Sequence, residues 1–156
     1  MMFRKSAEHI YAPATGTTMN LQNVDDEVFA NGMMGPGLVI NIAPSELCIY
    51  APAAGTVDAL YPTGHALGLK TKTGTALLLH VGLESFKKKG LIKKYISKGD
   101  MVRKGQLLLE IDPSIADPTD LIILLTFPEL SKTLTPLYEE GESVQSRKQR
   151  IFRVDP

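Results

Sequence analysis

The sequence contains little cysteine and no excess charge of either sign, and both shortages exclude classes of protein. A single cysteine, Cys48, cannot form an internal disulfide. Seventeen Lys and Arg residues balance seventeen Asp and Glu residues. The chain therefore lacks the summed field that would hold a nucleic acid or an anionic membrane surface, and any partner is expected to be recognised locally.

Long hydrophobic runs are missing as well. The most apolar stretch, residues 121–127, is far shorter than the roughly 20 residues that a helix needs to cross a bilayer. The first residues, MMFRKSAEHIY, have no apolar core of the kind found in a secretory signal. We therefore expect a soluble, cytoplasmic protein that is not inserted directly into a membrane.

Turn residues between short apolar runs are abundant. Thirteen Gly and ten Pro residues are spread along the 156 positions, and the runs between them are rich in Val, Ile, Leu and Thr. This pattern predicts strands at 16–21, 37–42, 47–51, 55–60, 66–71, 75–81, 94–96, 107–111, 121–125 and 151–154. Only two helical turns are expected, at 25–29 and 115–117. Short strands at this spacing favour an all-β, antiparallel sandwich or barrel.

An octapeptide occurs twice in the chain. Residues 10–17 read IYAPATGT and residues 49–56 read IYAPAAGT, a match at seven of eight positions. In each copy the Pro cannot donate to a sheet ladder and the Gly tolerates a tight turn, so each reads as a strand that turns a corner into another strand. We expect one domain over 1–156 with an internally duplicated β unit, in which residues 1–8 and the polar segment 139–149 are mobile.

Two histidines lie in a predicted hairpin, residues 64–80, GHALGLKTKTGTALLLH. If its loop has an even number of residues centred between Lys72 and Thr73, His65 and His80 are cross-strand neighbours with Cβ atoms about 4.5 to 5.5 Å apart. An odd loop would break this pairing. Strand alternation by itself places Leu77, Leu79 and Val81 on the face opposite His80, as core residues, and the histidine face carries Leu67, Leu69 and Leu78.

Paired imidazoles permit metal ligation, general acid–base catalysis, or nucleophilic catalysis by one ring with the other as a helper. For either histidine alone, a structural role with one hydrogen-bonded neighbour is the more common interpretation. Catalytic zinc normally has three protein ligands, whereas the third histidine is His9, near the N-terminus, and no HxH or HExxH spacing occurs. Thr63, two residues before His65, is placed to hold one ring nitrogen of His65. This arrangement favours a nucleophilic histidine with a helper.

The sequence resembles the glucose-type enzyme IIA family of the bacterial phosphoenolpyruvate-dependent sugar phosphotransferase system. The similarity covers most of the domain, at 10–16, 25–30, 33–37, 51–55, 63–66, 98–106 and 134–136, and its most specific part is 74–83, GTALLLHVGL. The chain departs from the family where Glu84 and Ser85 replace the usual Asp-Thr, and where residues 86–94 carry five lysines in nine positions. Such a run is usually a solvated loop; if it borders the site, it favours a more acidic partner.

The resemblance implies a phosphocarrier with a phosphohistidine intermediate. His80 would accept phosphate from the histidine phosphocarrier protein and pass it to a cysteine of a sugar-specific IIB domain, which works with a membrane IIC domain. His65 would be the helper, oriented by Thr63, and no cofactor or metal would be required. The implied partner-binding residues are Val28, Phe29, Met33, Met34, Tyr61, Leu78 and Glu84.

Three alternative functions are less well supported by the sequence. A non-catalytic regulatory module of the same fold would bind transporters or enzymes, and the presence of His80 argues against it. A lipoyl or biotinyl carrier is suggested by residues 99–107, GDMVRKGQL, but no Met-Lys-Met occurs and Lys72 lacks the expected neighbours. A lysostaphin-type zinc peptidase would need HxH ligands that the sequence lacks.

Overall fold

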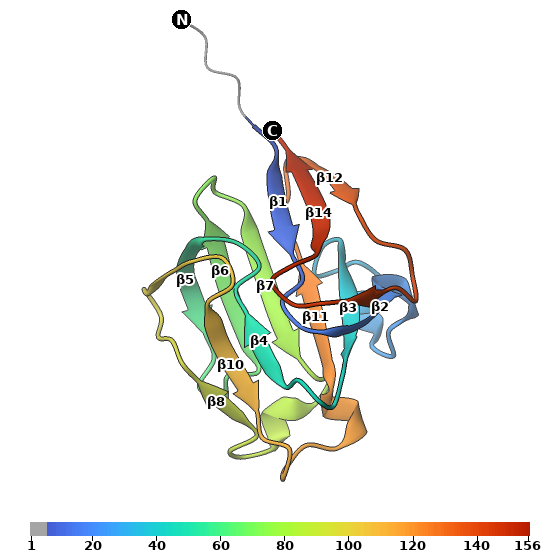
Figure 1. Ribbon diagram of the computed structural model, residues 1–156, viewed down its shortest axis with the longest axis vertical. Coiled ribbons are helices and arrows are strands. Elements are labelled where there is room, and N and C mark those ends of the chain that lie inside the picture. Colours follow the sequence, from blue (N-terminus) through green and yellow to red (C-terminus); the bar gives the residue numbers. More distant parts are fainter. Residues whose placement is uncertain (1–5) are drawn as a thin grey trace, which may run out of the picture.

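Three antiparallel sheets make up the part of the chain that the computed structural model describes, residues 6–156 (Figure 1). The eight-stranded sheet has the order β13-β2-β3-β11-β7-β6-β5-β9. Its strands are β2 (Gly16–Asn20), β3 (Gly37–Ile42), β5 (Gly55–Leu60), β6 (Ala66–Thr71), β7 (Ala76–Val81), β9 (Met101–Val102), β11 (Ile122–Thr126) and β13 (Ser143–Val144). The two three-stranded sheets are β1 (Glu8–Tyr11), β14 (Arg150–Asp155) and β12 (Thr133–Pro136), and β4 (Cys48–Tyr50), β10 (Leu107–Ile111) and β8 (Ile92–Lys94). The expected all-β antiparallel sandwich is confirmed.

The main core lies between the eight-stranded sheet and the two small sheets. Figure 1 shows β4 and β10 in front of the large sheet, and their apolar side chains join those of β6 and β7 in one buried cluster. Leu77, Leu79 and Val81 of β7 all belong to it, as predicted. A second, smaller cluster covers the opposite face of the large sheet and consists of Leu21, Val24, Phe29, Val39, Ile122 and Leu124. His80 alternates with the core residues of β7, so its side chain lies on the face of this second cluster.

Helical structure within residues 6–156 is limited to α1 (Glu27–Ala30) and three 3₁₀ turns, η1 (Leu21–Asn23), η2 (Ser85–Lys87) and η3 (Pro118–Asp120). The turn expected at 25–29 overlaps α1, which begins after Asp26 because the Asp26 carboxylate accepts from the backbone N–H of Val28 at 3.0 Å. The helical turn expected at 115–117 is displaced to η3, where a proline occupies the first position. No helix among the described residues is long and apolar enough to span a membrane.

The repeated octapeptide forms two reciprocal corners. The N–H of Tyr11 donates to Pro52 O at 2.9 Å, and the N–H of Tyr50 donates to Pro13 O at 2.8 Å. Each copy enters from a small sheet, β1 or β4, and continues into the large sheet as β2 or β5. Each of the two copies therefore accepts a backbone hydrogen bond from the other, as expected of a duplicated unit.

Glycine is needed in both copies because a neighbouring strand comes close, rather than because the backbone turns into a left-handed conformation. A Cβ at Gly16 would lie 1.9 Å from Asn41 O, and a Cβ at Gly55 would lie 2.2 Å from Lys70 O. We expect Gly16→Ala to lower the free energy of unfolding by about 3 kcal/mol, because a backbone carbonyl inside a sheet cannot move aside. The matched control is Gly74→Ala, which meets no atom within 4 Å and costs about 1 kcal/mol for its positive φ. Urea unfolding measures both; equal losses would contradict the steric explanation.

The β6–β7 hairpin differs from the predicted register by one residue. The loop has three residues, 72–74, ends at Gly74 with a φ of 90°, and is closed by Thr71 N–H donating to Thr75 O at 2.9 Å. Ala66, rather than His65, is therefore opposite His80, and the predicted cross-strand pairing of the two histidines is wrong. The same shift places Leu67 and Leu69 in the main core instead of on the histidine face.

Several short strands were not predicted. β9, β12 and β13 were missed, β1 was indicated only through the octapeptide corner and without bounds, and the strand expected at 94–96 lies at Ile92–Lys94. β9 and β13 have only two residues each, so no alternation is available in the sequence to indicate them. Segment 139–149 contains β13, and Glu140 accepts from Asn23 Nδ2 at 2.6 Å. These contacts do not test its expected mobility, which stays a prediction; of the other expected mobile segment, residues 1–5 lie outside the described residues.

A candidate site built on two histidines

His80 lies near the end of β7, between β6 and β11, with Ala66 and Leu124 as its neighbours in the ladders. Its Nδ1 is 2.8 Å from the backbone oxygen of Gly82. A carbonyl oxygen only accepts hydrogen bonds, so in the neutral ring Nδ1 carries the proton and Nε2 carries the lone pair. Gly82 directs its carbonyl back to the ring with a φ of 65°, and its N–H donates to Ile122 O at 2.8 Å. The backbone therefore sets the tautomer of His80.

His65 contacts His80 although the two residues are not a cross-strand pair. Its ring centroid is 5.3 Å from that of His80, with an interplanar angle of 82°. His65 immediately precedes β6, and its carbonyl accepts the N–H of Val81 at 2.8 Å. Because it lies outside the strand, its side chain is not bound to strand alternation. The two rings are therefore in contact as predicted, but His65 reaches His80 from outside strand β6 instead of from the opposite position in the ladder.

Thr63 takes the predicted position beside His65. Its Oγ1 forms a hydrogen bond with His65 Nδ1. When the hydroxyl donates, Nδ1 is the acceptor and Nε2 of His65 carries the proton. The pair then presents a lone pair on His80 Nε2 and an N–H on His65 Nε2.

Burial lowers the pKa of both histidines. For His65 the neighbouring His80 lowers the pKa further. For His80 burial prevails, although the Gly82 carbonyl and the Asp26 carboxylate raise its pKa. Desolvation disfavours the charged imidazolium, so both rings are held in the neutral state at neutral pH.

We expect the titration midpoint of His80, followed by NMR, to lie below 6.5. An unfolded histidine binds its proton near pH 6.5, above the folded value, so between the two values the unfolded state holds more protons. The contribution of His80 to stability is therefore present above pH 6.5 and is lost as pH falls from 6.5 to the folded pKa. Urea unfolding over this range measures the loss. A midpoint at or above 6.5 would contradict the assignment of a desolvated, neutral ring.

Three aromatic rings pack against the histidine pair. The ring of Phe29 packs edge-on against His80 at 5.2 Å, Tyr61 packs against His65 at 5.2 Å, and Phe86 lies 5.6 Å from His65. We call these three residues the aromatic rim. Phe29 is buried, whereas Tyr61 and Phe86 are about half exposed. A half-exposed apolar border around polar groups is typical of a docking surface.

The other predicted docking residues divide into exposed and buried ones. Val28 and Met33 are 45% and 73% exposed on and after α1, and Glu84 is exposed at the start of η2. Met34 packs against the second apolar cluster, and Leu78 lies half-buried on β7 on the same face as His80. Placement on one face is compatible with a shared role, which stays a prediction for each residue.

Two features of the site were missed from the sequence. Phe86 was grouped with the lysine run, although an isolated aromatic residue in a charged segment is a signal that the segment packs against something. The Gly82 carbonyl was missed because its direction depends on a positive φ that sequence spacing does not reveal.

The lysine run does not form one basic patch. Lys88 lies between Asp117 and Asp120, at 2.6 and 2.5 Å, and holds the pKa of Asp117 at about 2. Lys94 donates to Pro62 O at 2.6 Å, beside Thr63. Lys93 lies opposite Glu110 in the ladder of the small sheet. The run therefore splits between an ion pair, the border of the site and a separate surface.

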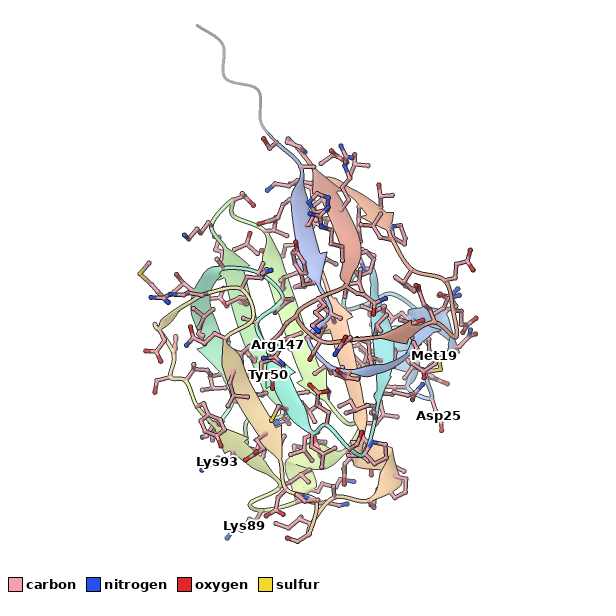
Figure 2. All side chains as sticks on the ribbon, in the orientation of Figure 1. Met19, Asp25, Tyr50, Lys89, Lys93 and Arg147 are labelled. Carbon is pink, nitrogen blue, oxygen red and sulfur yellow. The ribbon has the colours of Figure 1, made fainter. Side chains whose placement is uncertain are left out.

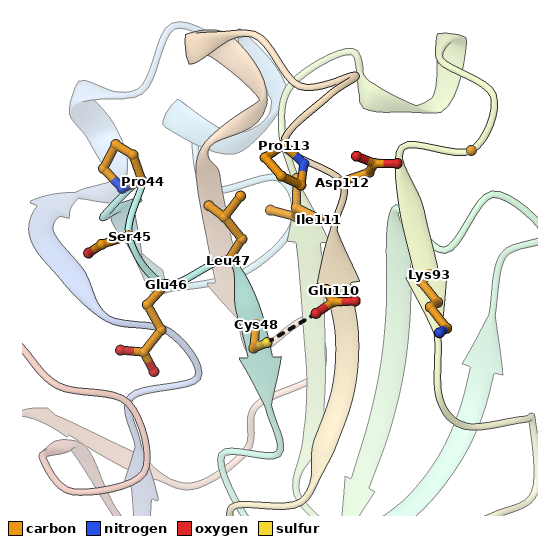
Figure 3. A pocket seen from close by; sticks show the side chains of 11 residues that line it. Pro44, Ser45, Glu46, Leu47, Cys48, Lys93, Glu110, Ile111, Asp112 and Pro113 are labelled. Atoms are coloured by element: carbon orange, nitrogen blue, oxygen red, sulfur yellow. Dashed lines mark hydrogen bonds between the residues drawn. The ribbon is translucent and has the colours of Figure 1, made fainter.

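A hollow elsewhere on the molecule contains the single cysteine. It is lined by residues of β4, β8 and β10, by the loop before β4 and by the loop after β10, and it includes Cys48 and Glu110 (Figure 3). Cys48 lies on β4, within the strand predicted at 47–51, and is partly buried. Its thiol is 3.8 Å from Glu110 Oε2, and burial raises the pKa of the thiol. No group of three or more His, Cys, Asp or Glu side chains in residues 6–156 is placed to hold a metal ion.

A family model described as phosphoenolpyruvate-dependent sugar phosphotransferase system, EIIA 1, matches residues 8–127. The chain belongs to this family. The match includes both histidines, Thr63 and the aromatic rim. The resemblance to glucose-type enzyme IIA drawn from the sequence is confirmed.

Relatives of this EIIA chain are found among separate and multidomain proteins. The glucose-specific EIIA component of Bacillus cereus is 40% identical over 110 residues, covering 70% of this chain and 66% of that protein. The glucose-specific EIICBA component of Staphylococcus saprophyticus is 41% identical over 110 residues but is covered to only 16% of its length. The structure of glucose permease IIA from Mycoplasma capricolum matches with a TM-score of 0.83 at 27% identity, covering 98% of this chain and 99% of that chain. The matched region therefore covers less than two thirds of the length of each of the first two relatives.

Proposed function

We propose that this EIIA chain is a phosphocarrier of a sugar phosphotransferase system. His80 accepts phosphate from the histidine phosphocarrier protein and passes it to a cysteine of a sugar-specific IIB domain. The observation that carries the proposal is the hydrogen bond from His80 Nδ1 to Gly82 O, which leaves a lone pair on Nε2 next to the His65 ring. The names of relatives such as the EIICBA component, which combine A with B and C, support a IIB partner.

The transfer step needs a nucleophile and a neighbour that compensates charge. The Nε2 lone pair of His80 forms an N–P bond while the N–P bond of the donor's phosphohistidine breaks and its electron pair returns to the donor nitrogen. No proton has to leave His80, because Nε2 of the neutral tautomer carries none. In the onward step a sulfur of the IIB cysteine forms an S–P bond while the N–P bond to His80 breaks and its electron pair returns to Nε2. His65 Nε2–H donates to an equatorial phosphoryl oxygen during this step, where charge is spread in the in-line transfer.

We propose that the reaction needs no metal or other cofactor. Two neutral rings and one oriented N–H supply the nucleophile and the charge compensation that the step requires. Docking of a partner on the aromatic rim and on Val28 and Met33 removes water from the site. The hydrogen bond from His65 Nε2–H to the phosphoryl oxygen is then stronger. Because methionine adapts to different contours, Met33 suits a face that receives two partners in turn.

Reconstituted phosphoryl transfer tests the proposal. The chain is incubated with labelled phosphoenolpyruvate, enzyme I and the histidine phosphocarrier protein, and then with a IIB domain. We expect a label that is labile in acid and stable in alkali, as a phosphohistidine is, and its passage to IIB. A chain that takes no label while the Bacillus cereus EIIA component is labelled in the same mixture would overturn the proposal in favour of a regulatory binding module.

A further inference from the structure

Two turns far apart in the sequence lie side by side in the structure. Residues 103–106 read RKGQ and residues 147–149 read RKQ. The N–H of Gly105 donates to Ala51 O at 2.8 Å, and the N–H of Arg147 donates to Ala12 O at 3.0 Å, so each turn closes over one copy of the octapeptide. A Cβ placed on Gly105 would lie 3.5 Å from Arg147 Cγ. The duplication therefore brings two Arg-Lys pairs together.

Each turn also places a cation over the tyrosine of the other copy. Lys104 Nζ is 3.9 Å from the centroid of the Tyr11 ring, and Arg147 Cζ is 4.2 Å from that of Tyr50. Figure 2 shows Arg147 and Tyr50 next to each other near the centre of the view. Arg150 Nε donates to the Tyr11 hydroxyl at 3.2 Å. Cation–π contacts of this kind hold the charged groups in place at the surface.

Arg147 occupies a backbone position that favours glycine. Its φ is 69°, and among residues 6–156 it is the single non-glycine residue with a positive φ. The equivalent residue of the other turn is Gly105, with a φ of 81°. A side chain at such a position strains the backbone. The chain thus carries a cation where the fold alone would favour glycine.

Four exposed cations of these turns and the exposed Arg150 at the start of β14 form what we call the cationic face: Arg103, Lys104, Arg147, Lys148 and Arg150. Among the described residues, no carboxylate forms an ion pair with any of them. Glu46 is held near the face by a hydrogen bond from Ser146 Oγ at 3.0 Å. In a chain with no net charge, the face is a local excess of positive charge.

The cationic face and the histidine pair lie on opposite sides of the molecule. Ile10 and Ile49 point into the main core, so the tyrosines that follow them point outward from the small sheets. His80 lies beyond the large sheet, on the face of the second apolar cluster. A surface bound at the cationic face therefore leaves the histidines accessible.

We propose that the cationic face binds the surface of an anionic phospholipid bilayer. The positive charges are spread over two turns and a strand, which suits a plane of headgroup phosphates. Met101, two residues before Arg103, is 80% exposed and supplies an apolar side chain that enters between headgroups, a contact of no use on a carboxylate-rich protein surface. The tyrosine rings are amphipathic and suit the interface. Each Lys or Arg near an anionic leaflet strengthens binding by about fivefold.

Co-sedimentation with vesicles tests this assignment independently of phosphoryl transfer. The probes are vesicles of phosphatidylglycerol mixed with phosphatidylcholine, and of phosphatidylcholine alone, at low and at physiological salt. One variant combines Arg103→Gln with Lys104→Gln; a second combines Arg147→Gly, which suits the positive φ, with Lys148→Gln. The control combines Lys89→Gln with Lys93→Gln, which removes the same charge near the lower end of the view in Figure 2.

We expect the wild type to bind only the anionic vesicles, and more weakly as salt rises. Each variant of the cationic face should bind anionic vesicles about 25-fold more weakly, because it has lost two charges. Binding of the control variant should fall by about twofold at most, since distant charges are screened. The salt dependence of the wild type decides the question even if a variant fails to fold. All variants should still take phosphate at wild-type rates.

Three results would overturn the assignment. One is a wild type that does not sediment with anionic vesicles at low salt. Another is a control variant that loses as much binding as the variants of the cationic face. The third is wild-type binding to polyglutamate without binding to vesicles, which would make an acidic protein segment the occupant. A failure of phosphoryl transfer with intact vesicle binding would instead refute the proposed function alone.

Discussion

Replacement of His80 by alanine should abolish acceptance of phosphate, with a loss on the order of 10³-fold or more, down to the background of the assay. His80 Nε2 is the lone pair that the Gly82 carbonyl keeps unprotonated and that faces the second ring. No other group of the histidine pair can replace it, because His65 Nδ1 is taken by Thr63. Labelling from phosphoenolpyruvate, quantified after alkaline and acid treatment, measures the loss.

His9→Ala is the matched control. His9 lies on β1 opposite Arg153, in a different sheet from the histidine pair, and its loss should leave labelling unchanged. Because alanine removes a ring that packs on Phe29, His80→Asn provides a second variant with less lost volume. Persistent acid-labile label in both His80 variants would show that the acceptor is another residue.

Substitution of His65 by glutamine should separate the two half-reactions. We expect the variant to accept phosphate on His80 but to pass it to a IIB domain about 10²- to 10³-fold more slowly, the usual cost of losing one oriented donor to a developing anion. Glutamine keeps similar bulk next to Tyr61 but cannot hold its donor at the position of the His65 ring. Quenched-flow measurement of each half-reaction gives the two rates.

Thr63→Ser controls for the role of Thr63 in orienting His65. Serine retains the hydroxyl that bonds His65 Nδ1, so transfer should stay near the wild-type rate, while Thr63→Val should slow it in the same half-reaction as His65→Gln. Equal slowing of both half-reactions in His65→Gln would indicate that His65 supports the fold of the site rather than the transfer step.

Local sequence patterns predicted the fold class well. The spacing of glycine and proline between β-rich runs indicated an antiparallel all-β domain, and β7 shows the expected alternation, with Leu77, Leu79 and Val81 inward and His80 outward. Alternation is a property of the strand itself, so it can be read without knowing the partner strand. The pairing of β6 with β7 cannot be read in this way, because it depends on whether the loop holds two or three residues.

In the candidate site, too, the residues were predicted from the sequence but their geometry was not. His65, His80 and Thr63 were found from hairpin spacing and family resemblance, and they meet in space. Their geometry was misjudged, because His65 precedes β6 and reaches His80 from outside the ladder. Phe86 and the Gly82 carbonyl were missed since both depend on the path of the chain after β7.

Neutral net charge led to the expectation of no summed attraction to an anionic membrane surface, but composition does not reveal that the folded chain gathers five exposed cations on one face. The Arg-Lys pairs at 103–104 and 147–148 are unremarkable in the sequence. The repeated octapeptide is evident in the sequence and forms two reciprocal corners. These corners bind the turns at 103–106 and 147–149, which therefore lie on one face of the molecule. Strand alternation, each copy of the duplicated octapeptide and the family motif involve residues close together in the chain, so they could be recognised from the sequence. The register of the histidines and the gathering of the cations arise from contacts between distant segments, so only the folded chain decides them.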